Sequence, residues 1–191
     1  VEVKRKVGYL PEDVGFYEDM TGMENLIYTA ELNGIPRSVA CENATSLLHR
    51  VGLGNETDKR TGKYSKGMRQ RLGLADVLIK DPEIIILDEP TSGIDPTGVQ
   101  DFIHLIRHLS HENGLTVLFS SHHLHQVQQL CDRVGLFGKG RLLTLIDINE
   151  LHNKPGELEE VYNHYLGGNE PDHSYCPDLY GFTLYGSEQY R

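Results

Sequence analysis

The sequence predicts an α/β fold: a mainly parallel sheet flanked by helices, with a small helical subdomain. The segment IIIL at 84–87 has four consecutive apolar residues, as in a strand covered on both faces of a parallel sheet. Strand, helix and strand patterns follow one another across 84–120, which is a βαβ unit with a right-handed crossover. Two helical patterns without an intervening strand, at 21–51, indicate the helical subdomain.

Size and composition narrow the functional class. The 191 residues suffice for one substantial core, and the formal net charge is -10. The 18 Lys and Arg residues are scattered, which argues against nucleic acid as a partner. Cys41, Cys131 and Cys176 form no CxxC pair, so neither a zinc site nor a disulfide framework is indicated, and a reducing cytoplasm fits best. No apolar run approaches the ~20 residues that cross a bilayer.

Two predicted strands end in acidic residues. Residues 7–10 are apolar and stop at a proline, so this strand carries Glu12 into a loop. The strand at 84–87 is followed at once by Asp88 and Glu89. Ligands of open α/β sheets bind at the carboxyl ends of the strands, where one carboxylate can hold a divalent cation and another can face a water molecule. The alternative is an acidic turn that only closes the strand.

The helical subdomain has clear start and stop signals. Thr21 and Glu24 have the spacing of a capping box, and Gly34 ends the helix that they begin. Pro36 suits the first turn of a second helix, whose apolar stripe reaches Val51.

A third helix follows Ser65, which can cap it. The residues of its expected buried face are spaced four, three and four apart: Met68, Leu72, Ala75 and Ile79. The small-residue turn at its start leaves amide groups that can bind phosphate oxygens, although a plain helix cap is the alternative.

After the strand at 84–87 and its two carboxylates, Asp95 and Pro96 begin a helix that ends near Gly114. The short apolar run at 116–120 is the next strand, and it delivers His122 to the sheet edge.

His122 is either an ordinary hydrogen-bonded histidine or a functional one. Its expected position, at the same sheet edge as Asp88 and Glu89, favours a function. The remaining histidines of this region have no consistent ligand spacing and are interpreted as solvated: His104, His108, His111, His123 and His125.

The last part of the chain is less informative. Residues 132–146 predict two strands joined by a glycine turn, followed by small helices at about 147–153 and 157–166. No element or function is assigned from 167 to 191.

Five segments together resemble the nucleotide-binding subunit of an ABC transporter, most closely the export-type, multidrug or ABC-2 class. In chain order they are YLPE at 9–12, YSKGMRQRLGLA at 64–75, IIILDEP at 84–90, SGID at 92–95 and SSH at 120–122. The resemblance covers residues 1 to about 166. It implies a partial P-loop NTPase core with an ABC-type helical subdomain.

The resemblance also implies a division of the chain. Its parts are 1–12, the remnant of the N-terminal core ending at the Q-loop; 13–73, the helical subdomain with the signature motif; 74–150, the RecA-like core; 151–166, C-terminal helices; and 167–191, a tail of unknown role.

Roles at the sheet edge follow from the same resemblance. Asp88 corresponds to the Walker B aspartate that holds Mg²⁺ through water, and Glu89 to the base that polarises the attacking water. His122 corresponds to the switch histidine at the γ-phosphate. Glu12 stands where the family usually has a glutamine that ligates Mg²⁺, so here a carboxylate adds charge beside the phosphates.

The resemblance also implies roles for residues that act between two subunits of a dimer. Ser65 and Gly67 match the signature loop, which contacts ATP held by the opposite subunit, and Asp95 matches the D-loop. Lys66 replaces a glycine of the common signature. The implied ligands are ATP and Mg²⁺. The implied partners are transmembrane permease subunits and a second copy or a paired ABC subunit, at the cytoplasmic face of the cell membrane.

One expected motif is missing. The phosphate-binding loop GxxxxGK[ST] occurs nowhere in the 191 residues. We therefore expect an N-terminally incomplete subunit whose full-length parent hydrolyses ATP to drive export, while this chain alone binds ATP poorly. The alternatives are a non-catalytic module that completes a partner's ATP site, and a soluble ATPase of this superfamily serving translation or DNA repair. The latter is disfavoured because there is no second cassette, long coiled coil or basic face.

Overall fold

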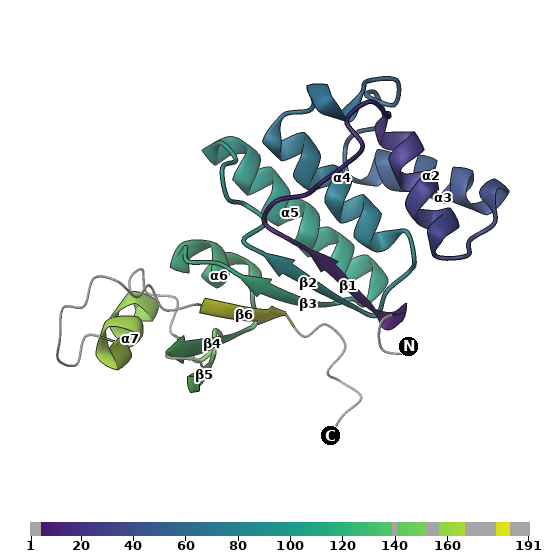
Figure 1. Cartoon of the computed structure of the whole chain (residues 1–191). Coiled ribbons are helices and arrows are strands. Elements are labelled where there is room, and N and C mark those ends of the chain that lie inside the picture. Colours follow the sequence, from purple (N-terminus) through teal and green to yellow (C-terminus); the bar gives the residue numbers. More distant parts are fainter. Residues whose placement is uncertain (1–4, 139–140, 152–156, 167–178, 184–191) are drawn as a thin grey trace.

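The computed structural model describes residues 5–138, 141–151, 157–166 and 179–183, with a sheet and helices packed on it (Figure 1). The sheet has six strands in the order β1-β2-β3-β6-β4-β5. Their bounds are β1 Val7–Leu10, β2 Ile84–Asp88, β3 Thr116–Ser120, β4 Arg133–Gly138, β5 Arg141–Asp147 and β6 Leu179–Thr183. Strands β1, β2 and β3 are parallel, as predicted, whereas β6 runs antiparallel to both β3 and β4.

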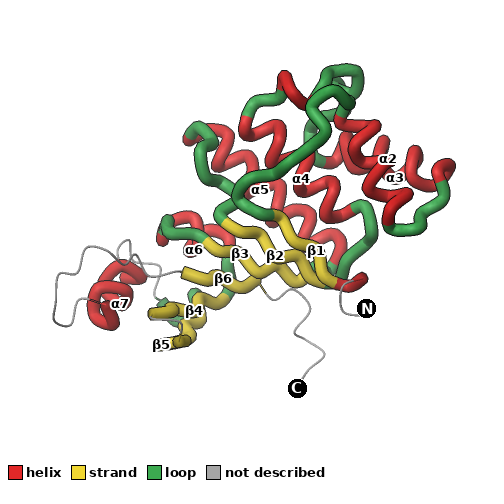
Figure 2. The backbone as a smooth tube through the Cα atoms, viewed as in Figure 1, coloured by secondary structure: helices red, strands yellow, loops and turns green. Residues whose placement is uncertain are grey.

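The helices predicted after Thr21, Pro36, Ser65 and Asp95 and at 157–166 are formed, whereas α6 and the short helix η1 were not predicted. Their bounds are α2 Gly22–Leu32, α3 Arg37–Arg50, α4 Lys66–Leu78, α5 Pro96–Asn113, α6 Leu124–Leu130 and α7 Glu157–Leu166, with a short 3-10 helix η1 at Thr61–Lys63 (Figure 2). The capping box of α2 is formed, since Thr21 Oγ1 accepts from the Glu24 amide at 3.2 Å and Glu24 Oε2 from the Thr21 amide at 2.7 Å. Gly114 ends α5 with a left-handed φ of 62°.

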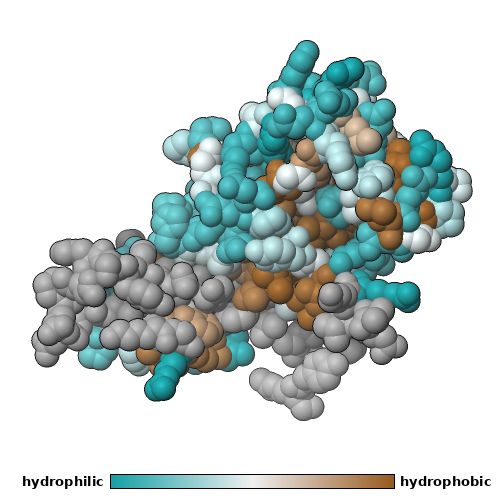
Figure 3. Space-filling view, in the orientation of Figure 1, coloured by the Kyte–Doolittle hydropathy of each residue, from teal (hydrophilic) through white to brown (hydrophobic). Residues whose placement is uncertain are grey.

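The prediction that β2 is buried on both faces is wrong. Ile85 and Leu87 are 1% and 0% exposed beneath the helices, but Ile84 is 38% exposed and Ile86 is half-buried. The helices α4 and α5 cover one face, and within the described ranges no helix covers the other. Figure 3 accordingly shows apolar side chains at the surface near the strands.

One expectation for the C-terminal part also fails. The helix at 147–153 is replaced, over its described residues, by a turn after β5, because Asp147 Oδ1 accepts from the Asn149 amide at 2.9 Å. Residues 152–153 lie outside the described residues. In the tail, to which the sequence assigned no element, residues 179–183 form β6, inserted between β3 and β4.

Candidate functional site

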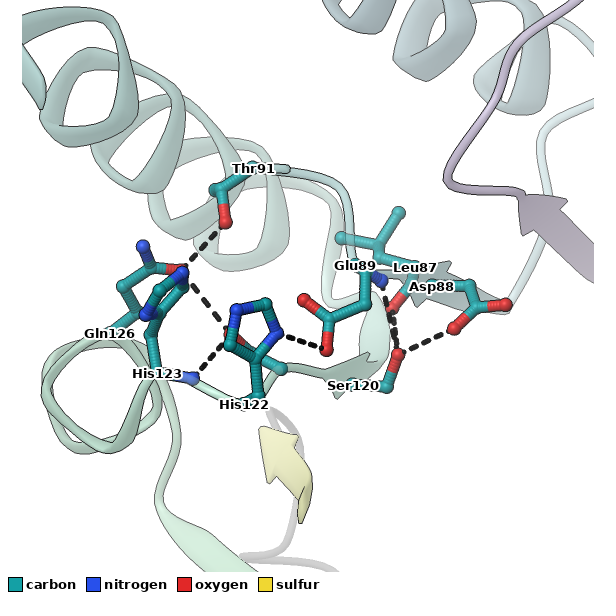
Figure 4. Close-up of polar contacts among 9 residues, drawn as sticks. Leu87, Asp88, Glu89, Thr91, Ser120, His122, His123 and Gln126 are labelled. Atoms are coloured by element: carbon teal, nitrogen blue, oxygen red, sulfur yellow. Dashed lines mark hydrogen bonds and ion pairs between the residues drawn. The ribbon is translucent and has the colours of Figure 1, made fainter. Parts of the chain in front are cut away.

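The register of the parallel strands brings the predicted site residues to one sheet edge. Leu87 of β2 pairs with Phe119 of β3, and Asp88 pairs with Ser120. The residues that follow these two strands therefore emerge side by side, as the close-up in Figure 4 shows.

Glu89 and His122 are in direct contact. Glu89 Oε1 lies 3.0 Å from His122 Nδ1, and the two side chains are 23% and 50% exposed. The backbone of Glu89 has a φ of 42°, which is uncommon for a residue other than glycine, and its amide donates to Ser120 Oγ at 3.1 Å. Its other oxygen, Oε2, is buried and has no hydrogen-bond partner within the described structure. The contact with His122 thus holds one oxygen of this carboxylate, while the other is buried and makes no hydrogen bond to the described residues.

Asp88 is held from both neighbouring strands. Ser120 Oγ donates to Oδ1 at 2.7 Å, and the Tyr9 hydroxyl donates to Oδ2 at 2.9 Å. The hydrogen bond to Asp88 raises the pKa of Tyr9, with smaller contributions from burial and from the carboxylate charge. Neither Tyr9 nor Ser120 was given a role from the sequence. Tyr9 pairs with Ile86 and so shares a face with Asp88, but this pairing depends on the strand register, which the sequence alone does not give.

This environment fits a magnesium ion bound in the way that enzymes of phosphate chemistry bind it. Mg²⁺ usually keeps several waters and takes one or two carboxylates together with substrate phosphates. In the part of the chain that the structure describes, no three His, Cys, Asp or Glu residues form a metal-binding group. A carboxylate oriented by two hydroxyl donors, as Asp88 is, suits an ion reached through water.

A second polar network joins the loops that carry Glu89 and His122. Thr91 Oγ1 donates to Gln126 Oε1 at 2.6 Å, and Ser121 Oγ donates to the same oxygen at 3.4 Å. Thr91 and Ser121 are 3% and 1% exposed. Gln126, which lies on α6, was also missed by the sequence analysis.

Ser65 and Gly67 lie at the start of α4, next to the loop that carries Glu12. Ser65 Oγ accepts from the Met68 amide at 3.2 Å, so the predicted cap is formed. Lys66 Nζ donates to the Glu12 carbonyl at 3.1 Å and to Asp13 Oδ1 at 2.6 Å.

These contacts fix the Glu12 loop on α4. The side-chain amide of Gln70 donates through Nε2 to the Glu12 carbonyl at 2.7 Å. The hydrogen bond from Lys66, followed by its charge, lowers the pKa of Asp13. The Glu12 side chain itself is exposed.

Asp95 begins α5 as predicted. Its Oδ2 accepts from the Gly98 amide at 3.0 Å. A β-carbon placed on Gly67 would lie 3.6 Å from Ile94 Cγ2, so the start of α4 is close to the SGID loop.

Among the helices in the described ranges, none is both long and apolar enough to cross a membrane.

Comparisons with known proteins identify a family and several relatives. The model of the ABC transporter family matches residues 1–92. The bacitracin transport ATP-binding protein BcrA of Bacillus licheniformis is 42% identical over 153 residues, covering 80% of this chain and 49% of BcrA. The linearmycin resistance ATP-binding protein LnrL of Bacillus subtilis is 31% identical over 155 residues, covering 81% of this chain and 50% of LnrL. The chain spans about half the length of these curated relatives.

A solved structure shares the fold. CbiO1 from Clostridium perfringens, described as part of the ABC transporter complex cbiONQ, superposes with a TM-score of 0.74 at 26% identity. The match covers 87% of this chain and 66% of CbiO1. The five motifs, the sheet-edge geometry and these similarities lead to one conclusion: the chain belongs to the family of ABC transporter ATP-binding domains.

Proposed function

We propose that the protein containing this chain binds and hydrolyses ATP as the ATP-binding subunit of an ABC exporter. The contact between Glu89 and His122, 3.0 Å long and adjacent to Asp88, carries the proposal. A base, a metal-holding carboxylate and an imidazole at one sheet edge are groups that phosphoryl transfer needs for positioning and charge neutralisation.

Each residue has a distinct role in this proposal. Glu89 accepts the proton of the attacking water, a role that its position at the sheet edge beside His122 supports. His122 orients Glu89 through Nδ1 and offers its second ring nitrogen to the γ-phosphate. Asp88 holds Mg²⁺ through water, and Glu12 offers a further oxygen. The ion, when bound, neutralises charge on the phosphate oxygens.

A second subunit completes the site. Ser65 and Gly67 bind the ATP held by the partner through the amino-terminal end of α4, where free amides and the helix dipole favour phosphate. Asp95 links the two sites across a head-to-tail dimer, formed by two copies or by a paired ABC subunit. This proposal requires a phosphate-binding GxxxxGK[ST] loop, which is not among these 191 residues.

Export through permease subunits at the cytoplasmic face of the cell membrane is supported by the relatives. Two of them are named for bacitracin transport and linearmycin resistance, which favours an antibiotic-like cargo. The helical subdomain, α2 to α4, is the proposed permease contact.

A non-catalytic module remains the second candidate, because GxxxxGK[ST] is absent from the 191 residues. On that view the start of α4 completes only a partner's ATP site. The coding sequence before Val1 separates the two: a GxxxxGK[ST] motif there supports the enzyme, and a start codon at Val1 supports the module.

The direct test is Mg²⁺-dependent ATP hydrolysis by the full-length protein. We expect phosphate release that stops with EDTA, and a dimer in light scattering when the Glu89→Gln protein is given ATP and Mg²⁺. A full-length protein that binds ATP but releases no phosphate, alone or with its permease, would reject the enzyme.

A further inference from the structure

We infer that Gln126 is a positioning residue that fixes the distance between Glu89 and His122. The inference deepens the proposed function and rests on it. Gln126 lies on α6 and contacts neither member of the pair in Figure 4; it acts through the two loops that carry them.

The loops meet at a single oxygen atom. Thr91, two residues after Glu89, donates to Gln126 Oε1 at 2.6 Å. Ser121, one residue before His122, donates to the same atom at 3.4 Å. One acceptor on α6 therefore ties the loop after β2 to the loop after β3.

The direction of these bonds follows from the atom on Gln126. Oε1 is an amide oxygen without a proton, so the Thr91 and Ser121 hydroxyls both donate to it. Ser121 Oγ also accepts from the His123 amide at 3.1 Å, which is compatible with its donating to Gln126. The two hydroxyls therefore require an acceptor on Gln126.

Burial makes this acceptor important. Thr91 and Ser121 are 3% and 1% exposed, so water cannot readily replace Gln126 as their partner. A buried hydroxyl left without a partner is costly, and the loops would shift to find one. The left-handed backbone of Glu89 also persists only when its surroundings hold it.

Two variants of the full-length protein test whether an acceptor is needed at position 126. Gln126→Met keeps the length of the side chain but removes the acceptor, so we expect kcat to fall by about 10–100-fold, the effect of misplacing catalytic groups by up to ~1 Å. KM for ATP should change much less than kcat, since His122 is the only proposed ATP-binding group that depends on the Gln126 contacts. Gln126→Glu keeps an acceptor and should restore kcat to within about threefold of the unsubstituted protein.

Gln129→Met, at an exposed glutamine of the same helix, is the matched control and should have unchanged kinetics. If Gln126→Met and Gln126→Glu lose activity equally, or if Gln126→Met retains full kcat, Gln126 does not position the pair.

A readout independent of turnover keeps the two proposals separable. In ¹⁵N NMR of the imidazole side chains, His122 should hold its proton on Nδ1 in the unsubstituted and Gln126→Glu proteins, and should show averaged tautomers in Gln126→Met. Unchanged His122 signals in a folded Gln126→Met protein would overturn the inference even if ATP hydrolysis is confirmed. The expected NMR change in a protein without ATPase activity would instead uphold the positioning and reject the proposed function.

Discussion

Glu89 Oε1 and His122 Nδ1 lie 3.0 Å apart although 33 residues separate them in the chain. The parallel pairing of β2 with β3 brings the ends of the two strands together, and the left-handed turn at Glu89 directs its carboxylate toward the imidazole. This contact fixes the orientation of the Glu89 carboxylate at the sheet edge, as the proposed general base requires.

Replacing Glu89 by glutamine should lower the ATPase rate of the full-length protein by ~10²–10⁴, since the amide cannot accept the water proton. ATP binding, measured by calorimetry, should persist. Glu150→Gln, at an exposed carboxylate after β5, is the control and should leave the rate unchanged. Near-normal turnover in Glu89→Gln would show that another group is the base.

His122 and His123 offer a matched comparison. Their ring centroids are only 4.0 Å apart, and both side chains are exposed. His122 contacts Glu89, so His122→Ala should lower kcat by roughly 10-fold or more through loss of orientation. His123→Ala should stay within about twofold, because general surface changes have small effects. Steady-state ATPase assays of the two variants measure both effects. An equal loss of kcat in the two variants would show that His122 has no special role.

Much of the fold could be predicted from local patterns. The capping box at Thr21, the cap at Asp95 and the glycine stop at Gly114 depend on neighbouring residues only, and each is formed. The burial of β2 on both faces could not be judged from its sequence, because an apolar run does not say which helices are present to cover it. Ile84 is the residue that shows the difference.

The site was predictable in its principal residues but not in their supports. Asp88 ends β2, Glu89 follows it and His122 follows β3, so topology alone places them at one edge. Tyr9 and Gln126 act through side-chain contacts that depend on strand register and on the packing of α6, which single-sequence periodicity does not determine.

Asp76, on α4, should make stability depend on pH. Burial raises the pKa of this carboxyl, opposed by a hydrogen bond from Thr29 and by the charge of Lys80. Since the folded state holds the proton to higher pH than the unfolded state does, stability falls as the pH rises from the ordinary aspartate pKa through the raised one. Asp76→Asn should therefore raise the free energy of unfolding at pH 8, and the gain should shrink toward pH 4.

Urea unfolding at pH 4 and at pH 8 measures this effect. Asp19→Asn, whose side chain is fully exposed, is the control and should change the free energy of unfolding by no more than about 0.5 kcal/mol. An Asp76→Asn protein that is less stable than the unsubstituted one at pH 8 would mean that the charged form is favoured in the fold.

The last prediction concerns the contact between α4 and β1, which positions the loop bearing Glu12. A β-carbon at Gly73 would lie 2.5 Å from Leu10 Cδ1 and 3.1 Å from Val14 Cγ2, so the helix approaches the strand closely because this residue has no side chain. Alanine would gain up to ~1 kcal/mol of helix propensity but would overpack the contact by roughly 1–3 kcal/mol. Leu10 is 1% exposed and has little room to move, so overpacking should prevail and Gly73→Ala should lower the urea midpoint. Gly15→Ala is the control, because no atom lies within 4 Å of the added carbon. A Gly73→Ala protein more stable than the Gly15→Ala protein would mean that α4 and β1 are less tightly packed than this geometry requires.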